Sequence, residues 1–470
     1  MNTFAHRAAS LLLIGAFVPL GLRAQSVTAR VDSIAQPWSN GRTPGFAVLV
    51  WQNGAVVLAK GYGLASVEHR VPITPDTPFL LGSVSKQFTA TAIMILADRG
   101  KLSYDDRLSK FFPDFPPYAD SITVRHLLNH LGGLPEYENL FVAKGLVDKN
   151  WPRSITTPPS RFEPTAHDAR TLLEKVSALE FAPGSRFRYS NSGYMVLAQI
   201  VEKVSGQPFR VFVSENIFAP LGMSHSVLYD ETRPVIPGRA SSYSGAKGRF
   251  NEIDYTPFNS IYGEDNVVTN LTDLAKWIAA LDRPQLVRPE TQALAFTPGH
   301  LNDGSETRYG FGWFTADWGG LRLIQHGGSW VGFRTAIVRF PDSLTVAVLA
   351  NQAETDAEAI AVAVGAVYLS RPIDRPVARP ITAARLGRLA GRYLVAPRTV
   401  ATITAAGTRA TADLPRLGRF ALAFDSDSTA FTPANILLRF RFRGGAGGKA
   451  ERLEIDRMGV TIAAGSRSAK

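Results

Sequence analysis

Leu81-Gly82-Ser83-Val84-Ser85-Lys86-Gln87-Phe88 is the stretch of this 470-residue chain that decides its fold. Apolar residues at helical spacing follow it and predict a helix over 87–99 that ends at Gly100. Ser83 and Lys86 are three residues apart, so they share one face near the N-terminus of this helix. Because a serine hydroxyl needs help to attack a carbonyl, a neighbouring lysine is one way to activate it. Ser83 is therefore the candidate nucleophile and Lys86 its candidate activator.

Two further motifs follow in order along the chain. Tyr189-Ser190-Asn191 stands in a turn that leads into a helical pattern, and His326-Gly327-Gly328 lies between two runs typical of strands. Tyr189 would supply a phenol for proton transfer, and the edge that carries His326 would dock the substrate. Glycines at 327 and 328 would let a substrate backbone approach the strand closely. The pattern leaves open whether Lys86 or Tyr189 takes the serine proton.

Similar short patterns occur elsewhere, and their context argues against a catalytic role. Ser244-Gly-Ala-Lys247 lies in an expected loop with no helix behind it, and Tyr137 lies in an expected polar loop after Gly132-Gly133, where it could line a pocket entrance. His126 and His130 have the spacing of a zinc pair, but Leu127 stands where zinc proteases carry glutamate. We therefore expect a structural helix there, no metal site and no cofactor.

The strand and helix patterns predict an α+β fold. A hairpin is predicted over 45–61 around Asn53-Gly54, and a second one over 333–351. Between them the pattern is mainly helical, with helices expected at 124–130, 192–204 and 271–281. Strands at both ends of this region predict one antiparallel sheet, flanked by helices, that is closed by distant segments and carries an inserted helical lobe. The absence of a Gly-x-Ser-x-Gly motif argues against an α/β-hydrolase.

The chain divides into four predicted parts. Arg7 and the apolar run from Leu11 to Leu22 predict a signal peptide over 1–24, and hence export to the periplasm or medium. The hydrolase domain is predicted over 25–370. Three prolines in residues 371–380 predict a linker. Residues 381–470 predict a small all-β domain, in which 436–443 alternates apolar and basic residues and 451–458 pairs back onto it.

Composition excludes some functions and locates the positive charge. With 45% hydrophobic and 19% charged residues, the chain has the material for a large core. It has no cysteine, so disulfides, thiolate metal sites and thiol nucleophiles are excluded. Residues 371–470 hold 18 basic and 7 acidic residues, which accounts for the whole net charge of +11. Two interpretations of this basic domain stay open: a solvated surface, which the scattered arginines favour, and an association with an anionic envelope polymer or lipid surface; no nucleic-acid motif accompanies it.

These motifs together resemble the penicillin-recognising serine hydrolase superfamily, in its branch of class C β-lactamases, DD-carboxypeptidases, D-aminopeptidases and related esterases. The resemblance spans about residues 30–370. Besides the three motifs it includes three segments, which are Ile122-Thr-Val-Arg-His-Leu-Leu-Asn-His130, Gly132-Gly-Leu-Pro135 and Gly328-Ser-Trp-Val-Gly-Phe333.

The resemblance implies a serine β-lactamase-like fold and a set of residue roles. Ser83 would be acylated, Lys86 would activate it, and Tyr189 would pass protons to the leaving group and help to activate water. The backbone N–H groups of Ser83 and Ser329 would form the oxyanion hole, and the site would include Asn191, His326 and Gly328.

The expected function is an exported serine hydrolase that acts on a peptide, amide or ester and is similar to D-aminopeptidases and DD-peptidases. Class C β-lactamases carry lysine where His326 stands, which counts against a dedicated β-lactamase. The alternatives are a carboxylesterase or β-lactamase of the same fold, and a non-catalytic penicillin-binding sensor.

Overall fold

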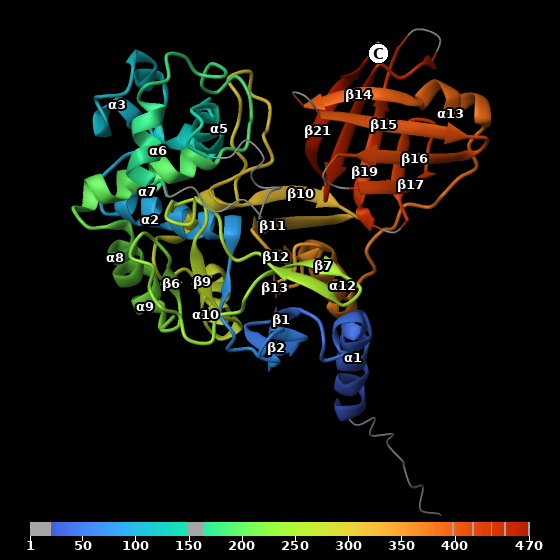
Figure 1. Cartoon of the computed structure of the whole chain (residues 1–470), viewed down its shortest axis with the longest axis horizontal. Helices are drawn as coiled ribbons and strands as arrows, with labels where there is room; N and C mark the ends of the chain where they lie inside the picture. Colours follow the sequence, from blue (N-terminus) through green and yellow to red (C-terminus); the bar gives the residue numbers. More distant parts are fainter. Residues whose placement is uncertain are drawn as a thin grey trace, which may run out of the picture.

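The computed structural model describes residues 20–147, 163–396, 399–415, 418–433, 435–445 and 448–468. These residues form two bodies, a sheet domain with a helical lobe and a C-terminal β-barrel (Figure 1). Most of the predicted signal peptide lies outside the described residues. In the part of the chain that the structure describes, no helix combines the length and the apolar character needed to cross a membrane.

The sheet domain is built on one six-stranded sheet. Its strand order is β10-β11-β12-β13-β1-β2, and every neighbouring pair is antiparallel. The strands are β1 Phe46–Gln52, β2 Ala55–Tyr62, β10 Phe314–Trp318, β11 Leu321–Trp330, β12 Phe333–Phe340 and β13 Leu344–Ala350. Both predicted hairpins are confirmed, and the pairing of β1 with β13 closes the sheet as expected.

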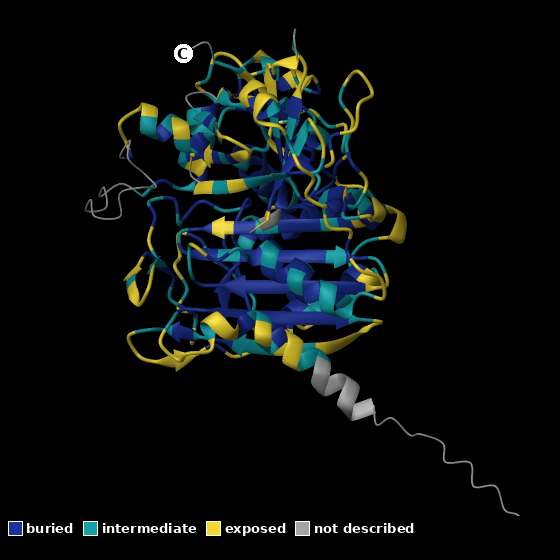
Figure 2. Cartoon of the chain, turned by 90° about the vertical axis from the view of Figure 1, so that its right-hand side faces the viewer, coloured by how far each residue is buried: buried dark blue, intermediate teal, exposed yellow. Residues whose placement is uncertain are grey.

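The two faces of the sheet are both buried, which explains why its central strands are almost wholly apolar. Along β1, Phe46, Val48 and Val50 pack on one face, while Ala47 and Leu49 pack on the other. Successive side chains of a strand point to opposite faces. One face therefore belongs to the core of the helical lobe, and the other lies under α1 (Leu20–Ala35) and α12 (Ala357–Tyr368). Figure 2 shows the buried central strands beneath these helices.

The helical lobe lies between the two hairpins in sequence, as predicted. Its helices are α2 Lys86–Asp98, α3 Leu108–Phe111, α4 Val124–Leu128, α5 Tyr137–Ala143, α6 Ala166–Leu173, α7 Asn191–Ser205, α8 Phe209–Val213, α9 Ala219–Leu221, α10 Leu271–Asp282 and α11 Pro289–Ala295. The predicted helices α2, α7 and α10 begin and end within a residue of these bounds. The helix predicted over 124–130 is shorter, because His130 takes a left-handed conformation with φ +59°.

Three small sheets join the lobe to the main sheet. They are β3 (Leu64–Ser66) with β4 (Val71–Pro72), β5 (Phe79–Leu80) and β6 (Val227–Leu228) on either side of β9 (Val267–Thr269), and β7 (Tyr243–Ala246) with β8 (Arg249–Glu252). Ser244 was expected in a loop and instead lies in β7, where it pairs with Asn251. It is therefore part of a hairpin rather than the start of a helix.

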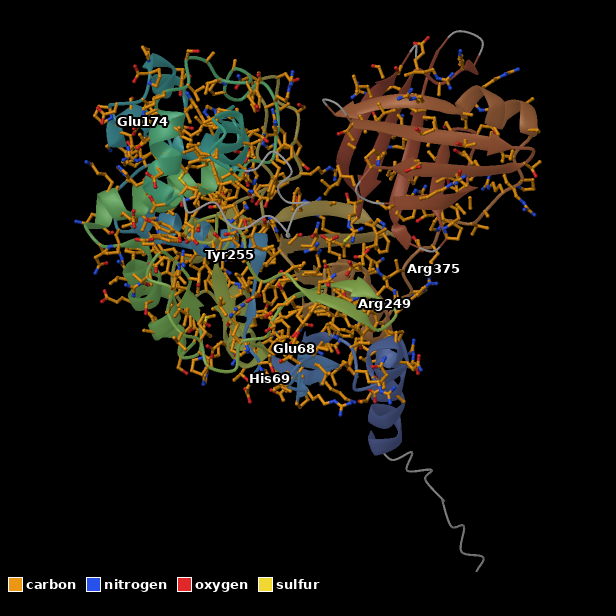
Figure 3. All side chains as sticks on the ribbon, viewed as in Figure 1. Glu68, His69, Glu174, Arg249, Tyr255 and Arg375 are labelled. Carbon is orange, nitrogen blue, oxygen red and sulfur yellow. The ribbon has the colours of Figure 1, made fainter. Side chains whose placement is uncertain are left out.

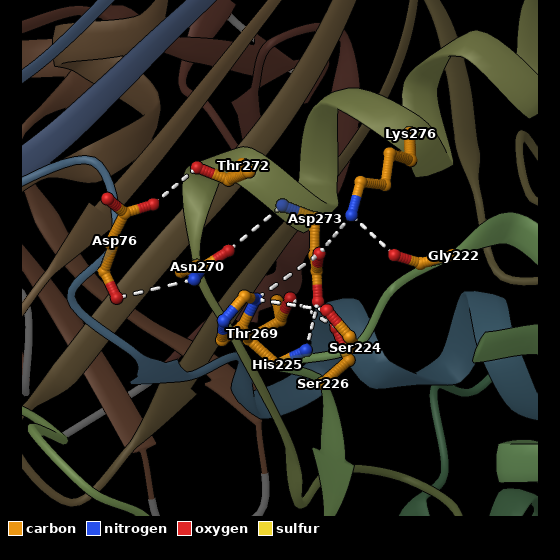
Figure 4. A network of polar contacts seen from close by, with 10 residues as sticks. All are labelled: Asp76, Gly222, Ser224, His225, Ser226, Thr269, Asn270, Thr272, Asp273 and Lys276. Carbon is orange, nitrogen blue, oxygen red and sulfur yellow. Dashed lines mark hydrogen bonds and ion pairs between the residues drawn. The ribbon is translucent and has the colours of Figure 1, made fainter. Parts of the chain in front are cut away.

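A polar network anchors the N-terminus of α10 (Figure 4). Asn270 caps the helix by accepting a hydrogen bond from the N–H of Asp273 at 2.9 Å. The buried Asp273 carboxylate accepts from the N–H of His225 at 2.7 Å and from the hydroxyl of Ser226 at 2.9 Å. Caps of this kind stabilise a helix by about 1 kcal/mol. The network thus ties the start of α10 to residues 225 and 226, and Ser226 also contacts Thr269, the last residue of β9, at 2.7 Å.

The segment 371–380, all of which the structure describes, contains no helix or strand and connects α12 to the C-terminal domain. Figure 3 labels Arg375 within this connection. After α13 (Ala383–Leu389), eight antiparallel strands close into a barrel. They are β14 Gly391–Ala396, β15 Thr399–Ala406, β16 Arg409–Leu414, β17 Gly418–Phe424, β18 Thr429–Thr432, β19 Asn435–Arg443, β20 Arg452–Arg457 and β21 Val460–Arg467. The predicted all-β domain is confirmed.

The alternation in β19 has the predicted meaning. Leu438, Phe440 and Phe442 are buried in the barrel core. Arg439 and Arg441 point outward and form ion pairs with carboxylates of neighbouring strands and turns. The arginines of this strand are therefore largely neutralised within the barrel itself.

Candidate active site

Ser83 lies in a short 3-10 turn, η2 (Gly82–Ser85), that runs directly into helix α2. Gly82 has φ +55°, and a Cβ on it would lie 2.8 Å from the backbone nitrogen of Ser329. Glycine is suited to both the conformation and the close approach. The backbone of Ser83 therefore lies beside the end of β11, while its side chain stays partly exposed.

Lys86 is fully buried at the start of α2. Its Nζ donates hydrogen bonds to Ser83 Oγ at 3.1 Å, to Asn191 Oδ1 at 2.9 Å and to the carbonyl oxygen of Glu264 at 2.9 Å. An ammonium group has three N–H donors, so each has an acceptor here. Nζ also lies 4.8 Å from the centroid of the Tyr189 ring, in a cation–π contact. Ser83, Tyr189 and Asn191, which are remote in sequence, thus meet around one buried amine.

The segment that presents the Glu264 carbonyl has an unusual backbone. Gly263 has φ +107° and Asn266 has φ +76°. Asn266 donates through Nδ2 to the carbonyls of Asn259 at 2.8 Å and Ile261 at 2.6 Å, which holds the segment in place. A non-glycine residue in this region costs on the order of 1–3 kcal/mol and persists only where its surroundings enforce it. The acceptor for Lys86 is therefore part of a rigid turn.

Asn191 is the first residue of α7, and two glutamates fix it. Its Nδ2 donates to Glu138 Oε1 at 2.9 Å, and its backbone N–H donates to Glu136 Oε2 at 2.9 Å. Because Nδ2 is directed to a carboxylate, Oδ1 faces Lys86, which can only donate. A continuous chain of hydrogen bonds runs from Glu138 through Asn191 and Lys86 to Ser83.

Four carboxyl groups are enclosed around this chain, and burial raises the pKa of each. The pKa of Glu136 rises to about 7 and that of Asp265 to about 8. The pKa of Glu264 lies well above its ordinary value, and that of Glu138 is also raised. Lys86 partly opposes the effect at Glu138, Glu264 and Asp265 because its charge favours the ionised carboxylates. These carboxyls keep their protons to higher pH than exposed ones do.

Tyr137 does not lie in a polar loop near an entrance, as its sequence context suggested. It belongs to α5 and is fully buried, with its ring 5.6 Å from that of Phe258. Its hydroxyl donates to Glu264 Oε1, and its N–H donates to Ser192 Oγ at 2.9 Å. The expectation was wrong because the apolar ring packs into the core, where the hydroxyl finds a carboxylate. Tyr137 thus supports the segment that carries the acceptor for Lys86.

Tyr189 contributes a phenol to the site. Its ring packs 4.3 Å from the ring of His130 and stacks on Phe314 at 6.1 Å between centroids. Among the residues that the structure describes, none hydrogen-bonds to the Tyr189 hydroxyl, although this oxygen is buried. A buried hydroxyl without a partner is uncommon and costs free energy. As far as the described residues go, the phenol therefore lies in the site with its hydrogen-bonding capacity unused.

His326 is placed on β11 but is turned inward. Its Nδ1 lies 2.7 Å from the Gly327 carbonyl, so Nδ1 carries the proton, and Nε2 accepts from the Tyr309 hydroxyl at 3.1 Å. Burial, together with the charge of Lys86, lowers the pKa of His326 to about 3. The side chain is only 2% exposed. His326 is therefore a neutral side chain that supports the strand from within and presents no cation to a ligand.

Gly328 and Ser329 bring β11 against the serine turn. A Cβ on Gly328 would lie 2.0 Å from the carbonyl oxygen of Leu81. Gly328 therefore makes room for the backbone just before Ser83, whereas its sequence context suggested room for a substrate backbone. Ser329 is exposed, and its backbone nitrogen adjoins Gly82. Pairing with β10 stops at Gln325, so the edge of residues 326–330 lies beyond β10.

The histidine pair predicted to be structural makes backbone contacts. His126 Nδ1 accepts from the N–H of Thr123 at 3.2 Å, and His130 Nδ1 accepts from the N–H of Ser190 at 3.0 Å. Within the described ranges, no group of three or more histidine, aspartate or glutamate side chains is arranged to hold a metal ion.

Comparison with known proteins finds relatives that share most of the length of this chain. Penicillin-binding protein 4* of Bacillus subtilis (strain 168) is 29% identical over 409 residues, which are 82% of this chain and 86% of that protein. D-aminopeptidase of Brucella canis is 30% identical over 66% of this chain, which spans only 56% of that relative's length.

Solved structures agree along most of the chain. An octameric penicillin-binding protein homologue from Pyrococcus abyssi has a TM-score of 0.64 and 26% identity, covering 93% of this chain and 99% of that one. EstCE1, a hydrolase with promiscuous acyltransferase activity, has a TM-score of 0.59 and 25% identity, covering 73% of this chain and 99% of that one. The family model for beta-lactamase matches residues 29–369. The chain belongs to the β-lactamase family of serine hydrolases, whose members include penicillin-binding proteins and D-aminopeptidases.

Proposed function

We propose that this protein is an exported hydrolase of the Ser-Lys-Tyr type, which acts through a Ser83 acyl-enzyme on a peptide, amide or ester substrate, as D-aminopeptidases and DD-peptidases do. The observation that carries the proposal is the contact between Lys86 Nζ and Ser83 Oγ at 3.1 Å, made by a fully buried amine next to a partly exposed hydroxyl. A positioned base of this kind contributes roughly 10²–10⁴ in rate.

The reaction has two covalent steps. Ser83 Oγ forms a bond to the substrate carbonyl carbon, and the bond from that carbon to the leaving amine or alcohol breaks as the leaving group takes a proton. Water then adds to the ester, releases the acid and returns the proton to Ser83. The unpaired Tyr189 hydroxyl is suited to pass protons in both steps.

Two candidates remain for the group that accepts the Ser83 proton. In the geometry described, Lys86 donates to Ser83 Oγ, so it acts as a base only in its neutral form. If Tyr189 is the base, Tyr189→Phe should abolish acylation. If Lys86 is the base, Tyr189→Phe should slow mainly the steps that need a proton at the leaving group or at water. Single-turnover labelling compared with steady-state turnover separates the two.

The oxyanion hole would be formed by the backbone N–H groups of Ser83 and Ser329. The close approach of Gly82 to the Ser329 nitrogen supports this assignment, because it puts the two amides on neighbouring chain segments. Losing one such donor costs roughly 10²–10³ in rate.

The substrate class follows in part from His326. A class C β-lactamase has a lysine at this place, whereas the histidine here is neutral and buried. His326 therefore supplies no positive charge for a substrate carboxylate. This counts against β-lactams, whose carboxylate such a charge would bind, and favours amides and esters that need no cationic partner at this place.

Labelling tests the acyl-enzyme directly. The protein is incubated with a fluorophosphonate and, separately, with labelled penicillin, and the modified peptide is mapped by mass spectrometry. Label on Ser83 that is lost in Ser83→Ala is the expected result. Label on another residue, or none, would defeat the proposal.

A substrate panel separates the peptidase from its alternatives. D-amino acid amides, p-nitrophenyl esters and nitrocefin report D-aminopeptidase, carboxylesterase and β-lactamase activity respectively. The similarity to EstCE1 gives the esterase specific support. A non-catalytic sensor would be labelled by penicillin at Ser83 and would then fail to release the acyl group.

Export and envelope association form a second part of the proposal. The apolar run before Ala24 supports export, and the surplus of basic residues in 371–470 supports an association with anionic envelope polymer. Fractionation of cells that produce the full-length protein tests both, together with a salt wash of the envelope fraction. Recovery in the cytoplasm would contradict export, and an envelope fraction unaffected by salt would contradict electrostatic association.

A further inference from the structure

The barrel touches the sheet domain through the turn between β20 and β21. In this turn Met458 has φ +49° and is fully buried, and its N–H donates to the Leu437 carbonyl at 3.0 Å. Next to it, a Cβ on Gly459 would lie 2.6 Å from the carbonyl oxygen of Asp317 in β10. The turn is therefore pressed against the strand that pairs with β11.

The contact is apolar as well as close. Leu437 and Met458 of the barrel belong to the same buried cluster as Trp318, Leu321 and Ile373. Trp318 and Leu321 flank the turn between β10 and β11. The barrel thus completes the core on one face of the sheet, at the hairpin that leads to the active-site strand (Figure 1).

Arg457 adds a polar anchor at the same place. Its guanidinium donates to Asp356 Oδ1 and to Glu358 Oε2, and its side chain is only 20% exposed. Asp356 is the N-cap of α12, where it accepts from the N–H of Ala359 at 3.0 Å. A planar guanidinium with several donors is suited to hold two carboxylates at once. One barrel residue therefore fixes the first turn of α12.

Glu358 in turn lies directly behind the active-site strand. A Cβ on Gly327 would lie 2.4 Å from Glu358 Oε1. On the opposite face of the same strand, Gly328 packs against the carbonyl of Leu81, just before Ser83. The strand at His326–Ser329 is held between Glu358 on one side and the serine turn on the other.

This part of β11 needs support from outside the sheet. It contains two successive glycines, which have no side chains to pack and are conformationally free. Beyond Gln325 this part of β11 pairs with β12 alone, because β10 begins at Phe314, the residue that pairs with Gln325. The atoms behind Gly327 therefore have a direct effect on where the Ser329 amide lies relative to Ser83.

We propose that Arg457 is a positioning residue for the hydrolase site: through Glu358, the C-terminal barrel holds the His326–Ser329 strand against the Ser83 turn in the geometry that acylation needs. The inference rests on the proposed function, since acylation of Ser83 is its readout. It gives the barrel a role in catalysis without contact with the substrate.

The test uses the full-length protein with a matched pair of variants. Arg457→Met removes both ion pairs and keeps the aliphatic stem. Arg452→Met is the control, because Arg452 lies on the same strand and, among the described residues, forms an ion pair only with Glu454 of the barrel, at 3.5 Å. The measurements are the second-order rate constant for fluorophosphonate labelling of Ser83, the melting temperature, and hydrogen exchange of peptides covering 326–330.

The expected result is at least a tenfold lower labelling rate and faster exchange at 326–330 in Arg457→Met, with both quantities unchanged in Arg452→Met. Arg457→Lys, which restores the charge, should recover part of the rate. A destabilised barrel alone would lower the melting temperature without a selective change at 326–330. Equal labelling and equal exchange in the two methionine variants would overturn the inference.

The experiment distinguishes a variant that does not fold from a failure of the proposed function. If Arg457→Met does not fold, Glu358→Gln replaces it, since this variant keeps the shape behind Gly327 and removes the charge that Arg457 binds. If the wild-type protein is not labelled at Ser83, the proposed function fails. Hydrogen exchange at 326–330 then still decides whether Arg457 holds the strand.

Discussion

Glu138 offers a sharp test of how the site is held together. It accepts a hydrogen bond from Asn191 Nδ2 at 2.9 Å, and Asn191 Oδ1 accepts from Lys86 at 2.9 Å. Glu138→Ala removes the acceptor that fixes the amide. A buried donor left without an acceptor costs about 1–3 kcal/mol. If Asn191 turns away from Lys86 to escape this cost, returning it to the reactive geometry takes the same free energy, and since 1.36 kcal/mol corresponds to a factor of ten, the loss in kcat/KM should lie between about 5-fold and about 150-fold.

The assay compares four proteins by labelling rate, ester hydrolysis and thermal unfolding. Glu138→Gln keeps an acceptor for Asn191, and because burial already raises the pKa of Glu138, a neutral side chain should be tolerated there. This variant should recover most of the activity lost in Glu138→Ala. Asn139→Ala alters the exposed neighbour and should match the wild type.

A clear result would refute the reasoning. If Glu138→Ala labels and turns over at the wild-type rate while its melting temperature is unchanged, Asn191 is not oriented by Glu138. The same conclusion follows if Glu138→Gln is as impaired as Glu138→Ala, because the acceptor would then not be what matters.

Three further predictions follow from buried groups. Burial raises the pKa of Asp265 from 3.8 to about 8, so between these pH values the folded state holds a proton that the unfolded chain releases. The free energy of unfolding should therefore fall as pH rises through this window, by at most about 1.4 kcal/mol per pH unit. Asp265→Asn should show a flatter dependence of melting temperature on pH, and a dependence as steep as that of the wild type would count against the prediction. His326, with a pKa of about 3, should keep its neutral NMR signature from about pH 8 to about pH 5, and a titration near the ordinary value of about 6.5 would contradict the buried placement. Gly328→Ala should abolish folding or labelling, because its Cβ would lie 2.0 Å from the carbonyl oxygen of Leu81. The control is Gly387→Ala, whose Cβ meets nothing within 4 Å and which should fold normally. A fully active Gly328→Ala would show that this packing is not needed.

The sheet and the main helices could be predicted because their signals are local. Asn53-Gly54 marks the first hairpin, and the helices that become α2, α7 and α10 have clear apolar periodicity and caps. Helix α12 gave no such signal. It is almost uniformly apolar, because it packs against β12, β13 and α1, and a helix with no polar face has no period to detect.

Only those residues of the site that belong to recognisable motifs could be predicted. Ser83, Lys86, Tyr189 and Asn191 were found through short patterns in a fixed order, and the structure brings all four together. Glu138 and the other enclosed carboxyls were missed, because the sequence alone does not distinguish a buried acidic residue from a solvated one.

His326 illustrates a different limit. Its position on a strand was predicted, but its inward rotation is set by Tyr309, which lies on a segment with no motif. Gly328 was interpreted through the substrate, whereas the neighbouring backbone at Leu81 is what excludes a side chain there. Such contacts depend on which distant segments meet, and neither periodicity nor spacing carries that information.

The junction of β1 with β13 has a consequence for how the protein is made. Phe46 pairs with Ala350, so the first strand has no partner on that side until some three hundred further residues have been synthesised. At about 5–20 residues per second, this interval lasts roughly 15–60 s. Throughout it, an apolar strand with unpaired backbone groups is open to association with other nascent chains. The protein should therefore depend on holding factors during biosynthesis, and truncations that end before Leu344 should accumulate as aggregates rather than as smaller folded domains.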